Sequence, residues 1–210
     1  MTLTRRTVGI SLIFALILLG ITGYEAGATF IIDPDPGGEK FFIDKADDVF
    51  SFTGHVGDQS SGPLVTVNTI GDVDTGSGYA NIKPIKDSIL TSLTFIPDDP
   101  KLFGDFSFRG QLKKLDGEDL KVTLKVWDSA DPSDYQMFTW DIEKANQDFD
   151  RIGIISTDET IYKVEISSDG FKEVKQIDFS YATPIPEPAI LLLLGIGLVG
   201  VGVLRKRVRR

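Results

Sequence analysis

The middle of the chain is a succession of short segments with strand-like alternation, and this pattern constrains the fold more than any other feature. Between Leu120 and Val126 every second residue is apolar. Such spacing places the apolar side chains on one face of an extended strand and the intervening lysines and threonine on the other. We expect further strands of this kind at 49–54, 64–69, 79–83, 90–96, 103–109, 136–142, 151–156, 160–167 and 174–181.

Turn-forming clusters separate these segments. Residues that favour turns gather at 74–78, 97–100, 116–118, 131–133 and 168–170. No part of the middle keeps a helical spacing of apolar residues over three turns, and no internal repeat is evident. Many short strands with frequent turns are typical of sandwiches and barrels. The sequence therefore predicts an all-β fold, an antiparallel β-sandwich of jelly-roll-like type.

The N-terminal end has a different character. Arg5 and Arg6 precede an apolar run at 8–21, and the small residues Ala26 and Ala28 follow. This order is typical of a secretory signal peptide, because signal peptidase requires a small-x-small pattern at its cleavage site. We therefore expect a signal peptide at 1–28, with cleavage after Ala28.

The C-terminal end combines three elements in a fixed order. A Pro-Glu-Pro triplet precedes an uncharged apolar run at 189–204. As a helix this run would extend about 24 Å, short of a hydrocarbon core of roughly 30 Å, so we expect transient membrane insertion through it. A basic tip would keep its charges on the cytoplasmic side, which places the rest of the chain on the other side. The triplet and the basic tip consist of Pro186, Glu187 and Pro188, and of Arg205, Lys206, Arg207, Arg209 and Arg210.

This order of elements resembles the PEP-CTERM sorting signal of Gram-negative bacteria. The resemblance implies a sorting signal at 183–210 that an integral-membrane exosortase recognises and processes. It also implies delivery to the envelope, cell surface or extracellular matrix, since PEP-CTERM systems accompany exopolysaccharide production. The alternative is an ordinary C-terminal membrane anchor with a basic stop, although such an anchor has no need of Pro-Glu-Pro at its outer edge.

The remaining part, 29–182, has the length of one domain. Its strings at 102–112, 149–154 and 166–180 resemble the β-rich domain that recurs in PEP-CTERM exported proteins. That family has no assigned activity, so the resemblance implies a fold and no reaction. The closing strand pair is also similar to the end of jelly-roll carbohydrate-binding modules, a likeness that many sandwiches share.

Composition argues against several classes of function. The chain has 22 basic and 31 acidic residues, of which 15 and 29 lie between the two ends, a formal charge of −14. This balance argues against nucleic acid as a partner, because binding it needs clustered Lys and Arg. The absence of cysteine excludes disulfides and thiol chemistry. His55 is the one histidine, and it is a candidate base beside Asp58, although a turn histidine is the simpler interpretation.

Acidic residues supply the candidate metal ligands. Asp72 and Asp74 lie one residue apart at the start of a glycine-rich segment that we expect to be a turn. Carboxylate oxygens that converge in such a turn are ligands for a hard cation, so a structural calcium ion is the one cofactor that the sequence suggests. The loops at 97–100 and 128–131 are weaker candidates of the same kind. A plain solvated turn is the alternative for all three.

Two aromatic residues form the candidate glycan contact. Trp127 falls on the Lys-bearing face of its strand, which we expect to be the outer face, and Tyr135 lies in the following loop. Exposed aromatic rings stack on the apolar faces of sugars, whereas the alternative is that Trp127 covers an edge of the sandwich or packs under a loop. Trp140 shares its face with apolar neighbours and is expected in the core.

The sequence thus predicts an exported, non-enzymatic β-sandwich that is structural or carbohydrate-interacting in exopolysaccharide. Signal peptidase and an exosortase are the expected processing partners. A secreted polysaccharide hydrolase is one alternative, because a glycosidase needs only a pair of carboxylates. A protein-binding surface adhesin is the other.

Overall fold

A computed structural model of the chain describes residues 30–86, 88–99, 103–113, 120–142, 148–156 and 160–182. The predicted signal peptide, its cleavage site and the sorting signal lie outside these ranges. No helix in the described part of the chain is long and apolar enough to cross a membrane. The strands are β1 (Phe30–Ile32), β2 (Glu39–Ile43), β3 (Ala46–Val56), β4 (Leu64–Thr75), β5 (Gly78–Tyr79), β6 (Asn81–Pro84), β7 (Leu90–Pro97), β8 (Phe103–Leu112), β9 (Leu120–Trp127), β10 (Gln136–Ile142), β11 (Asp148–Ser156) and β12 (Lys163–Tyr181).

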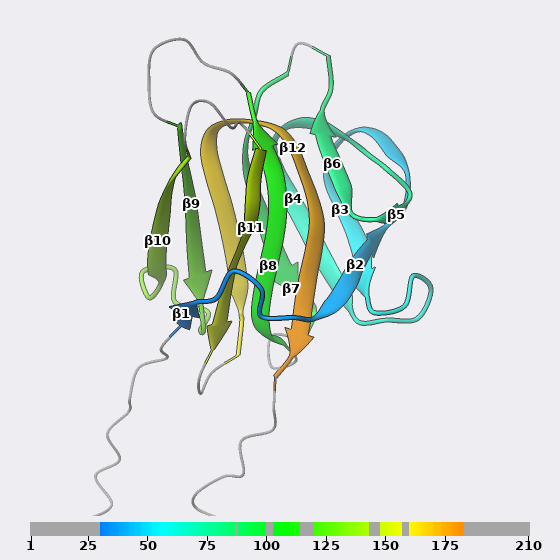
Figure 1. Cartoon of the computed structure of the whole chain (residues 1–210). Coiled ribbons are helices and arrows are strands. Elements are labelled where there is room, and N and C mark those ends of the chain that lie inside the picture. Colours follow the sequence, from blue (N-terminus) through cyan, green and yellow to red (C-terminus); the bar gives the residue numbers. More distant parts are fainter. Residues whose placement is uncertain are drawn as a thin grey trace, which may run out of the picture.

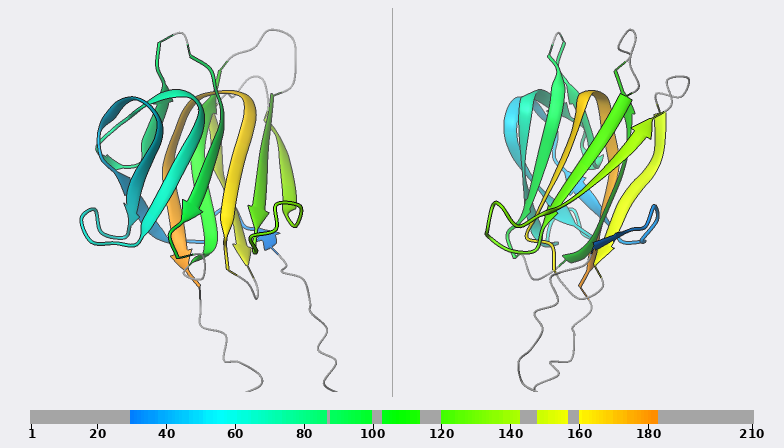
Figure 2. Two further views of the ribbon diagram at one scale, coloured as in Figure 1. Left: turned by 180° about the vertical axis from the view of Figure 1, so that it is seen from behind. Right: turned by 90° about the vertical axis from the view of Figure 1, so that its left-hand side faces the viewer.

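The strands form two packed layers, as Figures 1 and 2 show. The front sheet contains β1, β11, β8, the C-terminal half of β12, β2 and β5. The back sheet contains β10, β9, the N-terminal half of β12, β7, β4 and β3. The paired strands of both layers run antiparallel, and β6 joins β4 to β12. The prediction of an all-β antiparallel sandwich is confirmed.

Strand β12 belongs to both layers and arches over one end of the sandwich (Figure 1). Its residues 163–168 pair with β9, and its register shifts between Ser167 and Phe171 before the chain continues beside β8. The prediction of separate strands at 160–167 and 174–181 with a turn at 168–170 was therefore wrong. A bulge bends a strand without ending it, so the turn-forming residues here mark a change of layer.

Aromatic side chains fill the space between the sheets. Phe106 of β8 packs between Phe95 and Phe179, each with a ring-centroid separation of 5.2 Å. Phe41 of β2, a strand that the sequence did not predict, is fully buried beside them. Burying one such side chain stabilises a fold by about 1.5–3 kcal/mol, so this cluster holds the two layers together. On β9 the predicted alternation is confirmed, with Leu120, Val122, Leu124 and Val126 all buried.

The connection between β1 and β2, residues 33–38, crosses the outer surface of the front sheet (Figure 1). We call it the crossing segment. The Asp33 amide donates to the Gly153 carbonyl at 3.1 Å, and a Cβ atom on Gly153 would lie 2.6 Å from the Asp33 carbonyl oxygen. Gly38 has a φ of +124° and lies against Phe179. Glycine is thus required where the two backbones approach each other.

Both ends of the described domain lie at the same end of the sandwich. β1 lies there and β12 ends there, at the lower edge of Figure 1, with β11 and β8 between them in the sheet. The residues that follow Tyr181 lead to the sorting signal, so the attachment point of the C-terminal tail is at this end. The bend of β12 lies at the opposite end.

Candidate functional site

Trp127 does not form the exposed platform that its strand position predicts. Its side chain is only 4% exposed, although it lies on the outer side of the back sheet. The loop after β9 folds back over the ring, whose Nε1–H donates to the Pro132 carbonyl at 3.1 Å. On the other side, the Lys163 ammonium lies 3.6 Å from the ring centre. The expectation of exposure was wrong because strand alternation gives the direction of a side chain and not what covers it.

Tyr135, whose ring lies beside that of Trp127, remains accessible. Its ring lies 5.2 Å from the ring of Trp127 and is 43% exposed. The Lys125 ammonium lies 5.4 Å from the centre of the Tyr135 ring. It also forms an ion pair with Glu165 at 3.5 Å. A glycan contact at Tyr135 stays a prediction, but stacking on Trp127 would require the loop over it to move. The Trp140 ring is half-buried and packs against the core from its margin.

The Asp72 and Asp74 carboxylates lie on strand β4, not in a turn as predicted. Val73 between them is fully buried, so both carboxylates are on the outer side of the strand. An Asp74 oxygen accepts a hydrogen bond from the Asp48 amide at 3.1 Å, whereas Oδ1 of Asp72 is buried without a hydrogen-bond partner. Burial, and then the charge of Asp48, raise the pKa of the Asp72 carboxyl.

Calcium binding at these residues stays a prediction. Among the described residues no group of three or more His, Asp or Glu side chains is arranged to hold a metal ion. The acidic loop after β9 has local partners instead, since the Asp131 carboxylate accepts hydrogen bonds from the amide and hydroxyl of Ser133. These bonds lower the pKa of the Asp131 carboxyl.

His55 and Asp58 each have other partners. Nδ1 of His55 lies 2.8 Å from the Gly62 carbonyl, and the Asp58 carboxylate accepts hydrogen bonds from Ser60 and Ser61. Those bonds lower the pKa of the Asp58 carboxyl. The arrangement favours the simpler interpretation, a histidine that stabilises its own turn.

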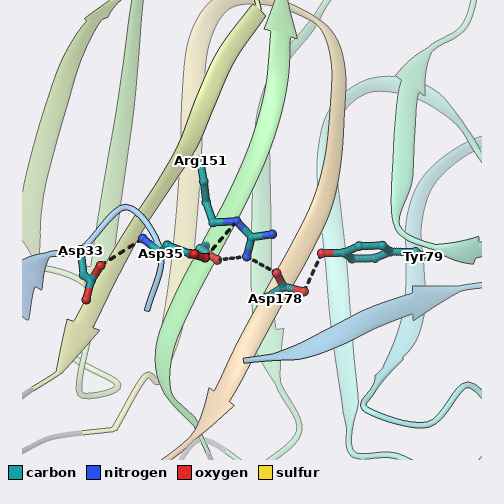
Figure 3. Close-up of polar contacts among 6 residues, drawn as sticks. Asp33, Asp35, Tyr79, Arg151 and Asp178 are labelled. Carbon is teal, nitrogen blue, oxygen red and sulfur yellow. Dashed lines mark hydrogen bonds and ion pairs between the residues drawn. The ribbon is translucent and has the colours of Figure 1, made fainter. Parts of the chain in front are cut away.

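The outer face of the front sheet carries a polar network that the sequence analysis missed (Figure 3). Arg151 of β11 forms an ion pair with the Asp178 carboxylate of β12, and its Nη1 also donates to the Ser107 hydroxyl of β8 at 3.2 Å. The Tyr79 hydroxyl donates to the other Asp178 oxygen at 2.6 Å. From the crossing segment, Asp35 lies 3.5 Å from Nε of Arg151. One network thus connects five elements across this face.

Burial controls the electrostatics of this network. Asp178 is only 5% exposed, so its charge requires compensation. Burial alone would lower the pKa of Arg151, but the hydrogen bond and charge of Asp178 outweigh it and raise the pKa. Burial, followed by the bond to Asp178, raises the pKa of the Tyr79 phenol above its usual range. The Arg151 guanidinium and the Tyr79 phenol therefore stay protonated at neutral pH. The network holds fixed protons and does not exchange them at this pH.

A row of polar residues crosses the same face one step farther along the strands. Arg109 of β8 is the register partner of Lys175 on β12, and Lys175 is the register partner of Asn81 on β6. Lys175 also lies 3.6 Å from Glu173, and Arg109 is exposed. Oδ1 of Asn81 is buried without a hydrogen-bond partner.

Neither the network nor the row of polar residues is visible in local patterns of the sequence. Asp178 and Tyr79 are separated by 99 positions, and Asp178 and Arg151 by 27, so no local motif connects them. The one usable signal is that Asp178 stands between the apolar residues Ile177 and Phe179 in a strand. A carboxylate in such a run needs a partner from another strand, which the sequence does not identify.

Comparison with known proteins identifies the tail. Residues 184–208 match the family model of the PEP-CTERM protein-sorting motif. No curated protein shows significant similarity to the chain. A similar solved structure is that of TmCBM61 in complex with beta-1,4-galactotriose, with 10% sequence identity and a TM-score of 0.24 over 73% of this chain and 88% of that one. That TM-score is too low to support an argument about the site.

Proposed function

We propose that this protein is a surface or matrix component whose β-sandwich interacts with exopolysaccharide without catalysing a reaction. The tail carries a PEP-CTERM sorting motif, so the protein is exported and processed by an exosortase. We assign the interaction with exopolysaccharide after export to the outer face of the front sheet.

The observation that carries the proposal is the position of the two chain ends. The domain joins the sorting signal at one end of the sandwich, so the attachment point does not lie on the outer face of either sheet. The front face combines aromatic and polar groups. Phe42 and Tyr79 have ring centroids 6.4 Å apart, and the Lys40 ammonium lies 5.3 Å from the Tyr79 ring. Aromatic rings beside fixed polar groups are typical of ligand-binding surfaces.

The ion-pair and hydrogen-bond partners of the buried carboxylate Asp178 support a non-catalytic role. A hydrolase needs one carboxyl group that exchanges a proton and a second that acts as base or nucleophile. The buried Asp178 instead holds Arg151 and Tyr79. Asp105, by contrast, has a pKa raised chiefly by burial and also by the charge of Asp33, although a hydrogen bond from Ser180 lowers it, so the assay of reducing sugar below decides whether this carboxyl acts as an acid.

The test uses the full-length chain in a nonionic detergent and the exopolysaccharide of its own host. Co-sedimentation should retain the protein on the polysaccharide without release of reducing ends. Release of reducing sugar would establish the hydrolase instead. Failure to sediment with this polymer or with any polysaccharide in a diverse panel would leave the adhesin as the better explanation. Bovine serum albumin, also acidic, is the control for non-specific retention.

A further inference from the structure

We propose that the front face carries a binding site for the carboxylate groups of an acidic polysaccharide, centred on Arg109 and Lys175. The inference rests on the proposed function and deepens it by naming the ligand class and the site. Three independent features of this face support it: a pairing of like charges, two bulges in the adjacent strands, and an unsatisfied polar atom beside them.

The first feature is the pairing of Arg109 with Lys175. The two are register partners on neighbouring antiparallel strands, so their side chains leave the same face of the sheet side by side. Like charges in this position destabilise a sheet. The domain has far more acidic than basic residues, so the placement is not a consequence of composition. An anion placed between the two cations would remove their repulsion.

The second feature is a pair of irregularities in the strands that flank Arg109. The register of β11 against β8 shifts between Phe149 and Ile152, and that of β12 shifts between Lys175 and Asp178. Within the second shift Gln176 has a φ of +51°, a conformation that side chains other than glycine rarely adopt. Bulges and local strain concentrate at binding sites, where they redirect side chains.

The third feature is the environment of these cations. On one side of Arg109 and Lys175 lies the fixed Arg151–Asp178–Tyr79 network. On the other side, Asn81 lies beside Lys175, and its Oδ1 atom is buried without a hydrogen-bond partner. A buried amide oxygen without a donor costs free energy until a donor arrives. Because this oxygen is buried, a sugar hydroxyl next to a bound carboxylate supplies such a donor only if the Asn81 side chain turns outward on binding.

The charges of this face favour widely spaced carboxylates over a densely charged polymer. Glu173 lies 3.6 Å from Lys175 and 3.7 Å from Lys83, and the charge of Arg151 is matched by Asp178. The surplus of positive charge is therefore centred on Arg109. A guanidinium binds a carboxylate through two parallel hydrogen bonds, a geometry that an ammonium does not offer. A nucleic acid would bring several phosphates against the nearby carboxylates.

The test measures binding of the full-length chain in nonionic detergent to hyaluronate, which carries one carboxylate on every second sugar, and to the same polymer after reduction of its carboxyl groups. Binding to the acidic polymer should exceed binding to the reduced one and weaken as salt is added. Arg109→Gln and Lys175→Gln should each weaken it by about tenfold or more. Arg109→Lys, which keeps the charge and loses the second hydrogen bond, should fall between. Lys121→Gln, an exposed lysine paired with Asp141 on the back sheet, is the matched control and should bind normally.

Stability separates loss of the site from loss of the fold. Because Arg109→Gln removes a like-charge repulsion, its melting temperature should equal or exceed that of the wild type, whereas a structural role for Arg109 would lower it. Equal binding to the acidic and reduced polymers, unaffected by Arg109→Gln, would overturn this site and leave the proposed function standing. Absence of binding to both polymers and to the host exopolysaccharide would overturn the two together.

Discussion

Replacement of Asp178 by alanine tests whether the front-face network holds the sandwich together. The substitution leaves the Arg151 guanidinium without its main counter-charge and the Tyr79 hydroxyl without its acceptor. The side chains of Arg151 and Asp178 are only 18% and 6% exposed, so water replaces the lost partner poorly. Removing one member of a buried ion pair costs about 3–5 kcal/mol, because the other charge stays buried.

The exposed edge of Arg151 and the nearby Asp35 favour the lower end of that range. We therefore expect Asp178→Ala to reduce the free energy of unfolding by about 3 kcal/mol. In a domain of this size such a loss corresponds to a fall in melting temperature of roughly 6–12 °C. Urea unfolding of the full-length chain in nonionic detergent, followed by tryptophan fluorescence, measures it. An unchanged slope of the unfolding free energy against urea concentration would show that the unfolded state is unaffected.

A double-mutant cycle isolates the ion pair from the loss of packing. If Arg151 and Asp178 stabilise the sheet chiefly through each other, the double replacement by alanine should cost clearly less than the sum of the single replacements, with a coupling of about 1–3 kcal/mol. Tyr79→Phe provides a smaller comparison at about 1 kcal/mol. A cost for Asp178→Ala below about 1 kcal/mol, or additive single effects, would show that this ion pair does not hold the sandwich together.

Three further predictions follow from the crossing segment, from Asp105 and from the tail. Gly153→Ala should destabilise by about 1–3 kcal/mol, since its Cβ would meet the backbone of the crossing segment, and urea unfolding measures the loss. The raised pKa of Asp105 means that the folded state holds its proton more tightly than the unfolded state, so stability falls as pH rises from the ordinary carboxyl range through the folded pKa. Asp105→Asn should therefore flatten this part of the pH–stability curve, and an unchanged curve would contradict it. Intact mass of the protein from the host surface should show loss of Arg205–Arg210 and an end near 186–188; an intact basic tip would exclude processing.

Local patterns in the sequence predicted the fold class and the sorting signal. Alternation with period two needs only neighbouring residues, and the Pro-Glu-Pro triplet, apolar run and basic tip are contiguous, so both are visible without tertiary contacts. The same locality explains the errors. Turn-forming residues at 168–170 mark a bend within β12 rather than its end, because the pairing that continues the strand comes from distant segments.

The candidate site shows the limit of sequence analysis more clearly. The position of Trp127 on the outer side of its strand was available from the alternation, but its burial depends on a loop that returns over the ring and on Lys163 from a strand far along the chain. The sequence likewise contains Arg109 and Lys175 without any sign that they are register partners.

Export, a processed tail and an antiparallel sandwich follow from the amino-acid sequence alone, because each of these depends on short-range order along the chain. Which polar residues act together depends on the folded arrangement of the strands. Strand pairing places Asp178 beside Arg151 and Tyr79, and Arg109 beside Lys175, across separations that no local pattern spans. Such contacts are set by the register of whole strands, and the burial of the apolar faces between the sheets fixes that register.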